Sequence, residues 1–136
     1  MIRFILIILF LGMSSVSAEE IEYETIEYKA FNESLLAGKY KDADWRDDPV
    51  VVSLKFVGPF EGLKQTIIRN NDSPESSDIA EIVITNKGLL DDSVMGIKYK
   101  LSLNETNNVW LIQSAQRAVK CWQGRGHADY SAEPCN

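Results

Sequence analysis

Apolar and polar residues alternate most clearly in the second half of the chain. Within residues 94–104, apolar and polar side chains alternate from position 97 onward: Ile97, Tyr99, Leu101 and Leu103 against Lys98, Lys100 and Ser102. A period of two with one polar face predicts a strand that is buried on one side only. Residues 79–86 and 109–122 also read as strands, with a turn at 87–93 and a hairpin loop at 105–108. The second half therefore predicts a three-stranded antiparallel meander.

The first half contains two helix candidates. Residues 30–40 have apolar positions at helical spacing, with Asn32 as a candidate N-cap and Gly38 as the end. Asp48 followed by Pro49 is a good helix start, because Asp caps free amides and Pro fits the first helical position.

The segment after Pro49 fits two structures. Residues 50–57 place apolar side chains on one helical face and also on one strand face, and three consecutive valines favour a strand. The preceding cap favours a helix, which is our prediction, and Gly58-Pro59 ends the element in either case. Residues 63–69 fit a strand or a helical turn, and residues 70–78 read as a polar loop. Residues 19–29 read as a lead-in strand or an unstructured arm.

A meander with one apolar face needs a cover, and the N-terminal helices supply it. The predicted fold class is α+β, with N-terminal helices packed on an antiparallel β-meander and a disulfide-closed loop at the C-terminus. This order of elements resembles the cystatin-like or nuclear-transport-factor-2-like cone folds. Such folds carry enzymes, binding pockets and inert modules, so the resemblance implies a fold and no activity.

The N-terminus has the features of a secretory signal peptide. Arg3 precedes an apolar run of residues 4–13, and small residues ending in Ala18 follow. The run is shorter than the roughly 20 residues of a membrane-spanning helix. We predict cleavage after Ala18, which leaves residues 19–136 as a single exported domain, periplasmic or secreted, with no membrane association after cleavage.

The charge of the chain limits its partners. The net charge is −6 at pH 7, and loss of Arg3 with the signal would make it more negative. Nucleic-acid binding depends largely on neutralising phosphates, so we expect no nucleic-acid partner. The sequence leaves the oligomeric state open.

The two cysteines, Cys121 and Cys135, have no third thiol to compete with. Exported proteins usually pair their cysteines, so a disulfide is expected. It would close a loop of about 15 residues and stabilise the fold by about 3 kcal/mol in the chain-entropy account.

A second resemblance rests on the C-terminal pattern. Gly88-Leu-Leu-Asp-Asp-Ser-Val94 and Trp110 precede Cys121-x-x-Gly124-Arg125-Gly126-His127-x-Asp129-Tyr130-Ser131-x-Glu133-Pro134-Cys135. The pattern resembles a family of uncharacterised bacterial secreted proteins over roughly residues 45–135. This resemblance implies export and carries no activity.

The same loop holds the candidate catalytic residues. His127 titrates near neutral pH and suits acid–base chemistry, and Asp129 or Glu133 could orient it. Ser131 lies nearby, but no G-x-S-x-G motif is present. A Ser-His-Asp triad is recognised by its geometry, so we assign no catalytic residue from the sequence.

Metal binding is weighed in the same loop and not predicted. One His and two Cys fall short of the usual four zinc ligands, and no oxygen-rich calcium loop occurs. We expect no metal and no cofactor.

Ligand-binding candidates are Arg125, His127, Trp122 and Trp45. Arg125 lies between two glycines, and its guanidinium together with the exposed glycine amides suits an anion. The interpretation that we favour is that the glycines allow a tight turn and that Arg125 pairs with Asp129 or Glu133. Indole rings stack on flat ligands but more often pack in a core. An acidic cluster around Trp45 (Asp42, Asp44, Asp47 and Asp48) is interpreted as a solvated loop.

The sequence therefore predicts an exported, non-enzymatic small domain that binds a small ligand or a protein partner through its C-terminal loop. One alternative is a small hydrolase-like enzyme that uses His127 with Asp129 or Glu133 and Arg125. Another is a structural or inhibitory module in which the loop only fixes the C-terminus.

Overall fold

The computed structural model describes residues 20–71 and 77–136. The predicted signal segment, its cleavage point after Ala18 and residues 72–76 of the predicted loop lie outside the described residues. In chain order the elements are β1 (Glu24–Thr25), α1 (Lys29–Leu36), the 3₁₀ turn η1 (Asp44–Asp47), α2 (Pro49–Val57), β2 (Lys64–Asn70), β3 (Ile79–Lys87), β4 (Val94–Thr106) and β5 (Val109–Cys121).

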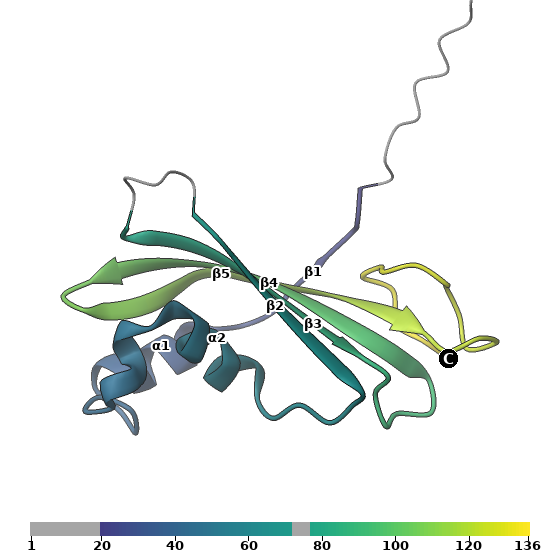
Figure 1. Cartoon of the computed structure of the whole chain (residues 1–136), viewed down its shortest axis with the longest axis horizontal. Coiled ribbons are helices and arrows are strands. Elements are labelled where there is room, and N and C mark those ends of the chain that lie inside the picture. Colours follow the sequence, from purple (N-terminus) through teal and green to yellow (C-terminus); the bar gives the residue numbers. More distant parts are fainter. Residues whose placement is uncertain (1–19, 72–76) are drawn as a thin grey trace, which may run out of the picture.

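The five strands of the described residues belong to one antiparallel sheet in the order β1-β5-β4-β3-β2 (Figure 1). The predicted meander is confirmed as β3, β4 and β5. It is wider than predicted, because β2 joins one edge and β1 the other. Residues 63–69, which fitted two structures, lie largely in strand β2. The lead-in segment contributes only the two-residue strand β1.

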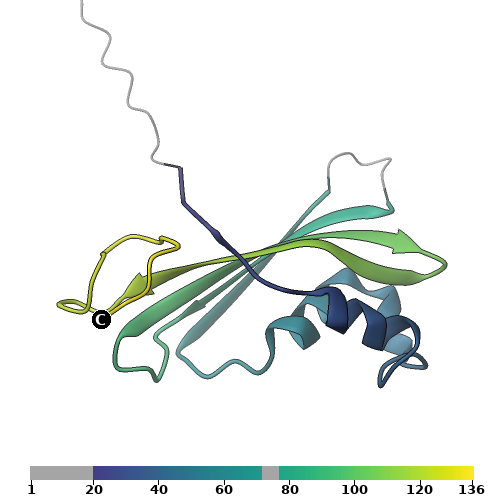
Figure 2. The same cartoon turned by 180° about the vertical axis from the view of Figure 1, so that it is seen from behind.

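The helices cover one half of one face of the sheet, while the C-terminal loop lies at the opposite end of β5 (Figures 1 and 2). The fully buried side chains between helices and sheet are Leu35, Val52, Ala80, Ile82, Ile84, Leu101, Leu103 and Ala115. Trp110 packs in the same cluster, and its Nε1 donates to the carbonyl of Asp47 at 3.0 Å. The α+β class and the helix-on-sheet arrangement are thus confirmed.

The N-cap at Asp48 explains why the segment after Pro49 forms a helix and not a strand. Asp48 Oδ1 accepts hydrogen bonds from the amides of Val50 (2.8 Å) and Val51 (3.3 Å). Two of the free amides of the first turn are therefore satisfied, as an N-cap requires. The helix prediction for residues 50–57 is confirmed despite the β-branched valines.

Helix α1 differs from its prediction at both ends. Asn32 is not the N-cap but lies inside the helix, where its amide exchanges two hydrogen bonds with the backbone of Ile112 (2.8 and 3.0 Å). The carboxylate of Glu27 accepts instead from the amides of Tyr28 and Lys29. The helix ends at Leu36, before Gly38. Asn32 is used for tertiary docking of α1 onto β5, which a local capping pattern cannot reveal.

No helix in the ranges 20–71 and 77–136 has the length and apolar character needed to cross a bilayer.

Candidate functional site

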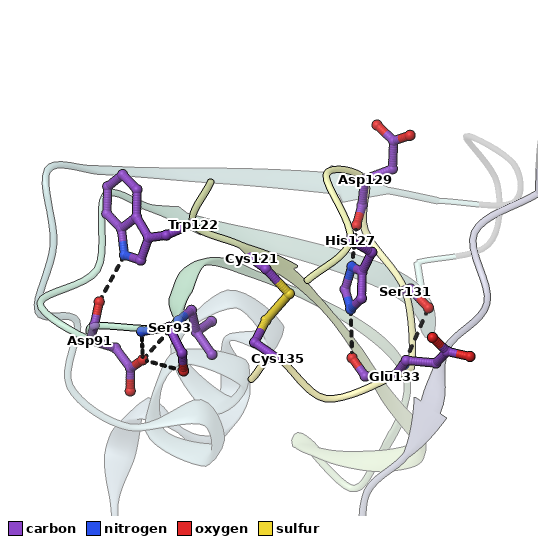
Figure 3. The surroundings of a disulfide bond; sticks show 10 residues. Asp91, Ser93, Cys121, Trp122, His127, Asp129, Ser131, Glu133 and Cys135 are labelled. Atoms are coloured by element: carbon purple, nitrogen blue, oxygen red, sulfur yellow. Dashed lines mark hydrogen bonds between the residues drawn. A yellow bond between two sulfur atoms is a disulfide. The ribbon is translucent and has the colours of Figure 1, made fainter. Parts of the chain in front are cut away.

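The C-terminal loop is fixed to the sheet by a disulfide, which Figure 3 shows, and by backbone hydrogen bonds. Cys121 and Cys135 form the predicted disulfide, with Cα atoms 5.6 Å apart. Val119 and Ser131 exchange two backbone hydrogen bonds (2.8 and 2.9 Å), and the amide of Cys121 donates to the carbonyl of His127 at 3.2 Å. The loop is therefore an ordered extension of β5.

His127 is the centre of this loop, and both of its ring nitrogens are occupied. Nδ1 lies 2.7 Å from the carbonyl oxygen of Asp129, and Nε2 lies 2.7 Å from the carbonyl oxygen of Glu133 (Figure 3). Carbonyl oxygens only accept, so both nitrogens must carry a proton for both bonds to form. The hydrogen bonds to Glu133 and then Asp129 raise the pKa of His127 above its usual 6.5. The geometry favours a charged imidazolium that ties the loop together.

The side chains that a Ser-His-Asp triad would need do not converge on His127. The residues Asp129 and Glu133 approach the ring through their backbone carbonyls, whereas both side chains are exposed. Ser131 Oγ accepts a hydrogen bond from the amide of Glu133 at 3.2 Å. With both nitrogens bonded to carbonyls, His127 has no lone pair free to accept a proton from a nucleophile.

Within the described residues, one group offers three metal-ligating atoms close together. The sulfurs of Cys121 and Cys135 and a ring nitrogen of His127 lie within 4.8 Å of one another. The two sulfurs are joined as a disulfide, and the thiolate is the form of cysteine that ligates metals. The donor set of the oxidised protein therefore does not suit a metal ion.

Arg125 occupies the exposed tip of the loop between Gly124 and Gly126, both of which have positive φ (80° and 137°). Such backbone favours glycine. In the part of the chain that the structure describes, the guanidinium of Arg125 forms no ion pair, so the expected pairing with Asp129 or Glu133 does not form. Arg125 is exposed and lines neither the two hollows that meet at Ile97 nor the hollow between residues 20–22 and 127–131.

The two tryptophan candidates are engaged in packing. Trp122 Nε1 donates to the carbonyl of Asp91 at 2.7 Å, which ties the turn before β4 to the end of β5 (Figure 3). Trp45 packs edge-on against Tyr40 at 5.2 Å, and Lys55 Nζ lies 5.7 Å from the centre of its ring. Beside it, Asp48 caps α2, while Asp42, Asp44 and Asp47 are exposed.

The sequence interpretation missed a groove on the half of the helix-side sheet face that the helices leave uncovered. A hollow of about 440 Å³ lies beside the end of α2 and another of about 410 Å³ beside the disulfide, and Ile97 lines both. The first is also lined by Val57, Pro59, Asn86, Tyr99 and the acidic residues Glu61 and Asp91, and the second by Arg117, Val119, Pro134, Cys135 and the acidic residue Glu24. We call this surface the sheet groove.

The strand register explains the groove. Asn86, Ile97 and Val119 are paired across three strands, and Tyr99 is paired with Arg117 in the next row. Asn86 accepts from Gln65 Nε2 at 2.9 Å, and Arg117 Nε contacts Glu24 at 3.0 Å.

The groove alters the pKa of one of its residues, and it can also be recognised in the sequence. Burial raises the pKa of Tyr99, and the charge of Arg117 opposes this shift. Asn86 and Arg117 are polar residues at positions where the alternation of their strands demands apolar ones. That break in the pattern was the available signal for an uncovered end of the sheet.

A third hollow of about 550 Å³ lies on the other side of the loop, between residues 20–22 and 127–131. It is lined by the acidic residues Glu20, Glu22 and Asp129, all of which are exposed. The ring of His127 borders it, but both ring nitrogens are directed at carbonyls of the loop itself. This hollow therefore presents three acidic side chains and no free ring nitrogen, so it does not suit an anionic ligand.

The described chain is an α+β domain with helices on one face of a five-stranded antiparallel sheet and a disulfide-closed C-terminal loop. No family model, no curated protein and no solved structure matches it.

Proposed function

We propose that this chain is an exported binding module that holds a small amphipathic ligand in the sheet groove, between the end of α2 and the disulfide-closed loop. The observation that carries the proposal is the meeting of two hollows at Ile97, on the part of the helix-side face that the helices leave open. Ligand pockets are typically several hundred Å³, largely apolar, with a few placed polar groups.

The chemistry of the walls defines the ligand class. Ile97, Val119 and Val57 offer an apolar floor, while Asn86 and Arg117 offer hydrogen bonds at separate points. A ligand with an apolar body fits this distribution if its polar end bonds Asn86, or if its anionic end replaces Glu24 as the partner of Arg117. The C-terminal loop contributes Pro134 and Cys135 as one wall, so in this proposal the loop takes part in binding.

Two finer inferences support an exported binding module. Helices on one end of an antiparallel sheet, with the rest of that face open, are the arrangement expected of a cystatin-like or nuclear-transport-factor-2-like cone. The signal-like N-terminus and the disulfide are compatible with the periplasmic or secreted location that we infer. The resemblance to uncharacterised bacterial secreted proteins is part of the same inference.

We do not extend the proposal to hydrolysis. That alternative needs His127 as a base with Asp129 or Glu133 as its orienting carboxylate. The ring is instead bonded at both nitrogens to backbone carbonyls, and this contact pattern suits a structural cation.

The test is a titration with anilinonaphthalene sulfonate, an apolar fluorescent anion, followed by amide NMR shifts. We expect saturable binding that shifts the amides of Ile97, Tyr99 and Val119. Ile97→Trp should fill the place where the hollows meet and abolish this binding. Val83→Trp is the matched control, because Val83 is also partly buried but lies on the opposite face of the sheet, and it should bind as the wild type does.

Two results would overturn the proposal. One is unchanged probe binding by Ile97→Trp. The other is a set of shifts confined to residues 20–22 and 127–131, which would place the ligand in the third hollow.

A further inference from the structure

The two edges of the sheet are finished in different ways. On the β5 edge, β1 pairs with Gln116 and Arg117, and the amide of Ile26 donates to the carbonyl of Ala115 at 2.9 Å. Further along, Ser131 pairs with Val119. Both end segments of the described chain thus cover this edge.

Among the described residues, the β2 edge of the sheet has no partner strand on its outer side. Lys64–Asn70 forms seven successive pairs with β3 without a register shift, and within residues 20–71 and 77–136 no segment pairs with its outer side. An uncovered strand presents a row of unpaired N–H and C=O groups, and natural proteins usually blunt it with proline, bulges or charges. Here only Lys64 and Arg69 are charged, and neither proline nor bulge interrupts the strand.

Apolar side chains are also concentrated at this edge. Of the five large hydrophobic side chains that are exposed in the described residues, three belong to β2 or adjoin it: Leu63 (86%), Ile67 (38%) and Ile68 (50%). Ile67 and Ile68 are neighbours in the strand, so they point to opposite faces of the sheet. A strand added here would cover apolar surface on both faces.

The sequence of β2 is complementary to itself. In an antiparallel pair of two β2 strands with Ile67 opposite Ile67, all seven residues are paired. Lys64 then lies opposite Asn70, and Arg69 lies opposite Gln65. Thr66 lies opposite Ile68. No two like charges face each other, so this register avoids the contacts that destabilise cross-strand pairs.

We propose that two copies of this chain pair through β2, antiparallel and about a two-fold axis at Ile67, so that their five-stranded sheets become one continuous sheet. A two-fold interface needs one self-complementary patch, and β2 supplies backbone partners, apolar cover and compatible charges together. This inference is independent of the ligand-binding proposal, because the sheet groove can be occupied in either oligomeric state.

The experiment is sedimentation velocity of the purified oxidised protein over a dilution series. We expect a concentration-dependent monomer–dimer equilibrium. Ile67→Lys places two ammonium groups opposite each other at the axis and should weaken dimerisation at least about tenfold. Leu90→Lys is the matched control, since Leu90 is exposed but lies outside β2, and it should dimerise as the wild type does. Circular dichroism checks that both variants are folded.

A second measurement tests the geometry directly. The described chain has no free cysteine, so Ile67→Cys introduces the only free thiol there, and mild oxidation should yield a covalent dimer. Leu90→Cys should not form one at the same rate. A wild type that stays monomeric at every soluble concentration overturns the proposal. So does a dimer that Ile67→Lys leaves intact, or one that both lysine variants weaken equally.

Discussion

The hydroxyl group of Tyr130 lies over Gly96, on the face of the sheet that the helices do not cover. A methyl group built on Gly96 would be 2.9 Å from the Tyr130 oxygen and 3.0 Å from the carbonyl oxygen of Asn86. The Tyr130 ring thus covers the gap that the missing side chain leaves, and Lys98 Nζ lies 4.7 Å from the ring centre.

This contact predicts that Gly96→Ala destabilises the protein. The added methyl would have to displace a ring and a backbone carbonyl, and overpacking of this kind costs about 1–3 kcal/mol. Urea unfolding of the oxidised protein measures the change. Gly124→Ala is not a fair control, because Gly124 has positive φ; Ser102→Ala, on the same strand and face, is one. A wild-type midpoint for Gly96→Ala would contradict the contact.

The hydroxyl group of Tyr130 also predicts that its removal does not destabilise the protein. Among the described residues, the Tyr130 oxygen is buried and has no hydrogen-bond partner, and burial raises the pKa of Tyr130. An unpaired buried polar atom carries a desolvation cost. Tyr130→Phe should therefore leave the free energy of unfolding unchanged or raise it, by up to about 1 kcal/mol. A loss of stability would show that the hydroxyl has a partner in solution.

His127 predicts a pH dependence of the C-terminal loop. Folding raises its pKa above 6.5, so the folded protein holds this proton more tightly than the unfolded chain does. The resulting stabilisation is fully present below pH 6.5 and is lost as the pH rises through the folded pKa. Long-range nitrogen–proton NMR should show both ring nitrogens protonated at pH 6.5.

His127→Gln supplies the control for this linkage. The variant should lack the dependence of loop stability on pH above 6.5 that the wild type shows, as measured by amide exchange of Ser131. A folded pKa at or below 6.5 would mean that the two carbonyl contacts do not persist in solution.

The disulfide predicts a stability change of known origin. Cys121 and Cys135 are 14 residues apart, and closing a loop of about this size stabilises a fold by about 3 kcal/mol. The double substitution Cys121→Ser with Cys135→Ser should lose that amount in urea unfolding. Reductant should destabilise the wild type and leave the double variant unaffected. Equal stability of the two proteins would mean that the backbone bonds of the loop are sufficient alone.

The N-cap at Asp48 predicts that substitution of this residue destabilises helix α2. Its carboxylate accepts from two amides of the first turn of α2, and loss of such a cap typically costs about 0.5–2 kcal/mol. Asp48→Ala should show that loss, whereas Asp42→Ala should not, since Asp42 is exposed and caps no helix. Equal effects of the two substitutions would point to a general charge effect.

The fold was largely predictable because its signals are local. The alternation in residues 94–104 and the Asp48-Pro49 start each act within a few residues, and both were interpreted correctly. The sheet edges were not predictable, since two-residue β1 has no periodicity and β2 is exposed along most of its length. Asn32 was misread for a related reason: its partner, Ile112, is distant in sequence.

The candidate site was less predictable than the fold. Pairing of Cys121 with Cys135 followed from their number together with the predicted export. The partners of His127 are backbone carbonyls, which every residue possesses, so no side-chain pattern marks them. The sheet groove arises from where the helices stop, and only Asn86 and Arg117, polar at inward positions, indicated it beforehand.

Glu24 and Ser131 both flank β5, opposite Arg117 and Val119, so segments from the two ends of the described chain run along one strand. A short linker could join them into a ring. The circular chain could then be opened between Asn107 and Asn108 to give new termini, because both residues have positive φ in the tight turn between β4 and β5. Such a circular permutant would keep the core and the disulfide loop while placing its ends at the helical end of the molecule, which gives a way to immobilise the protein with the sheet groove left open.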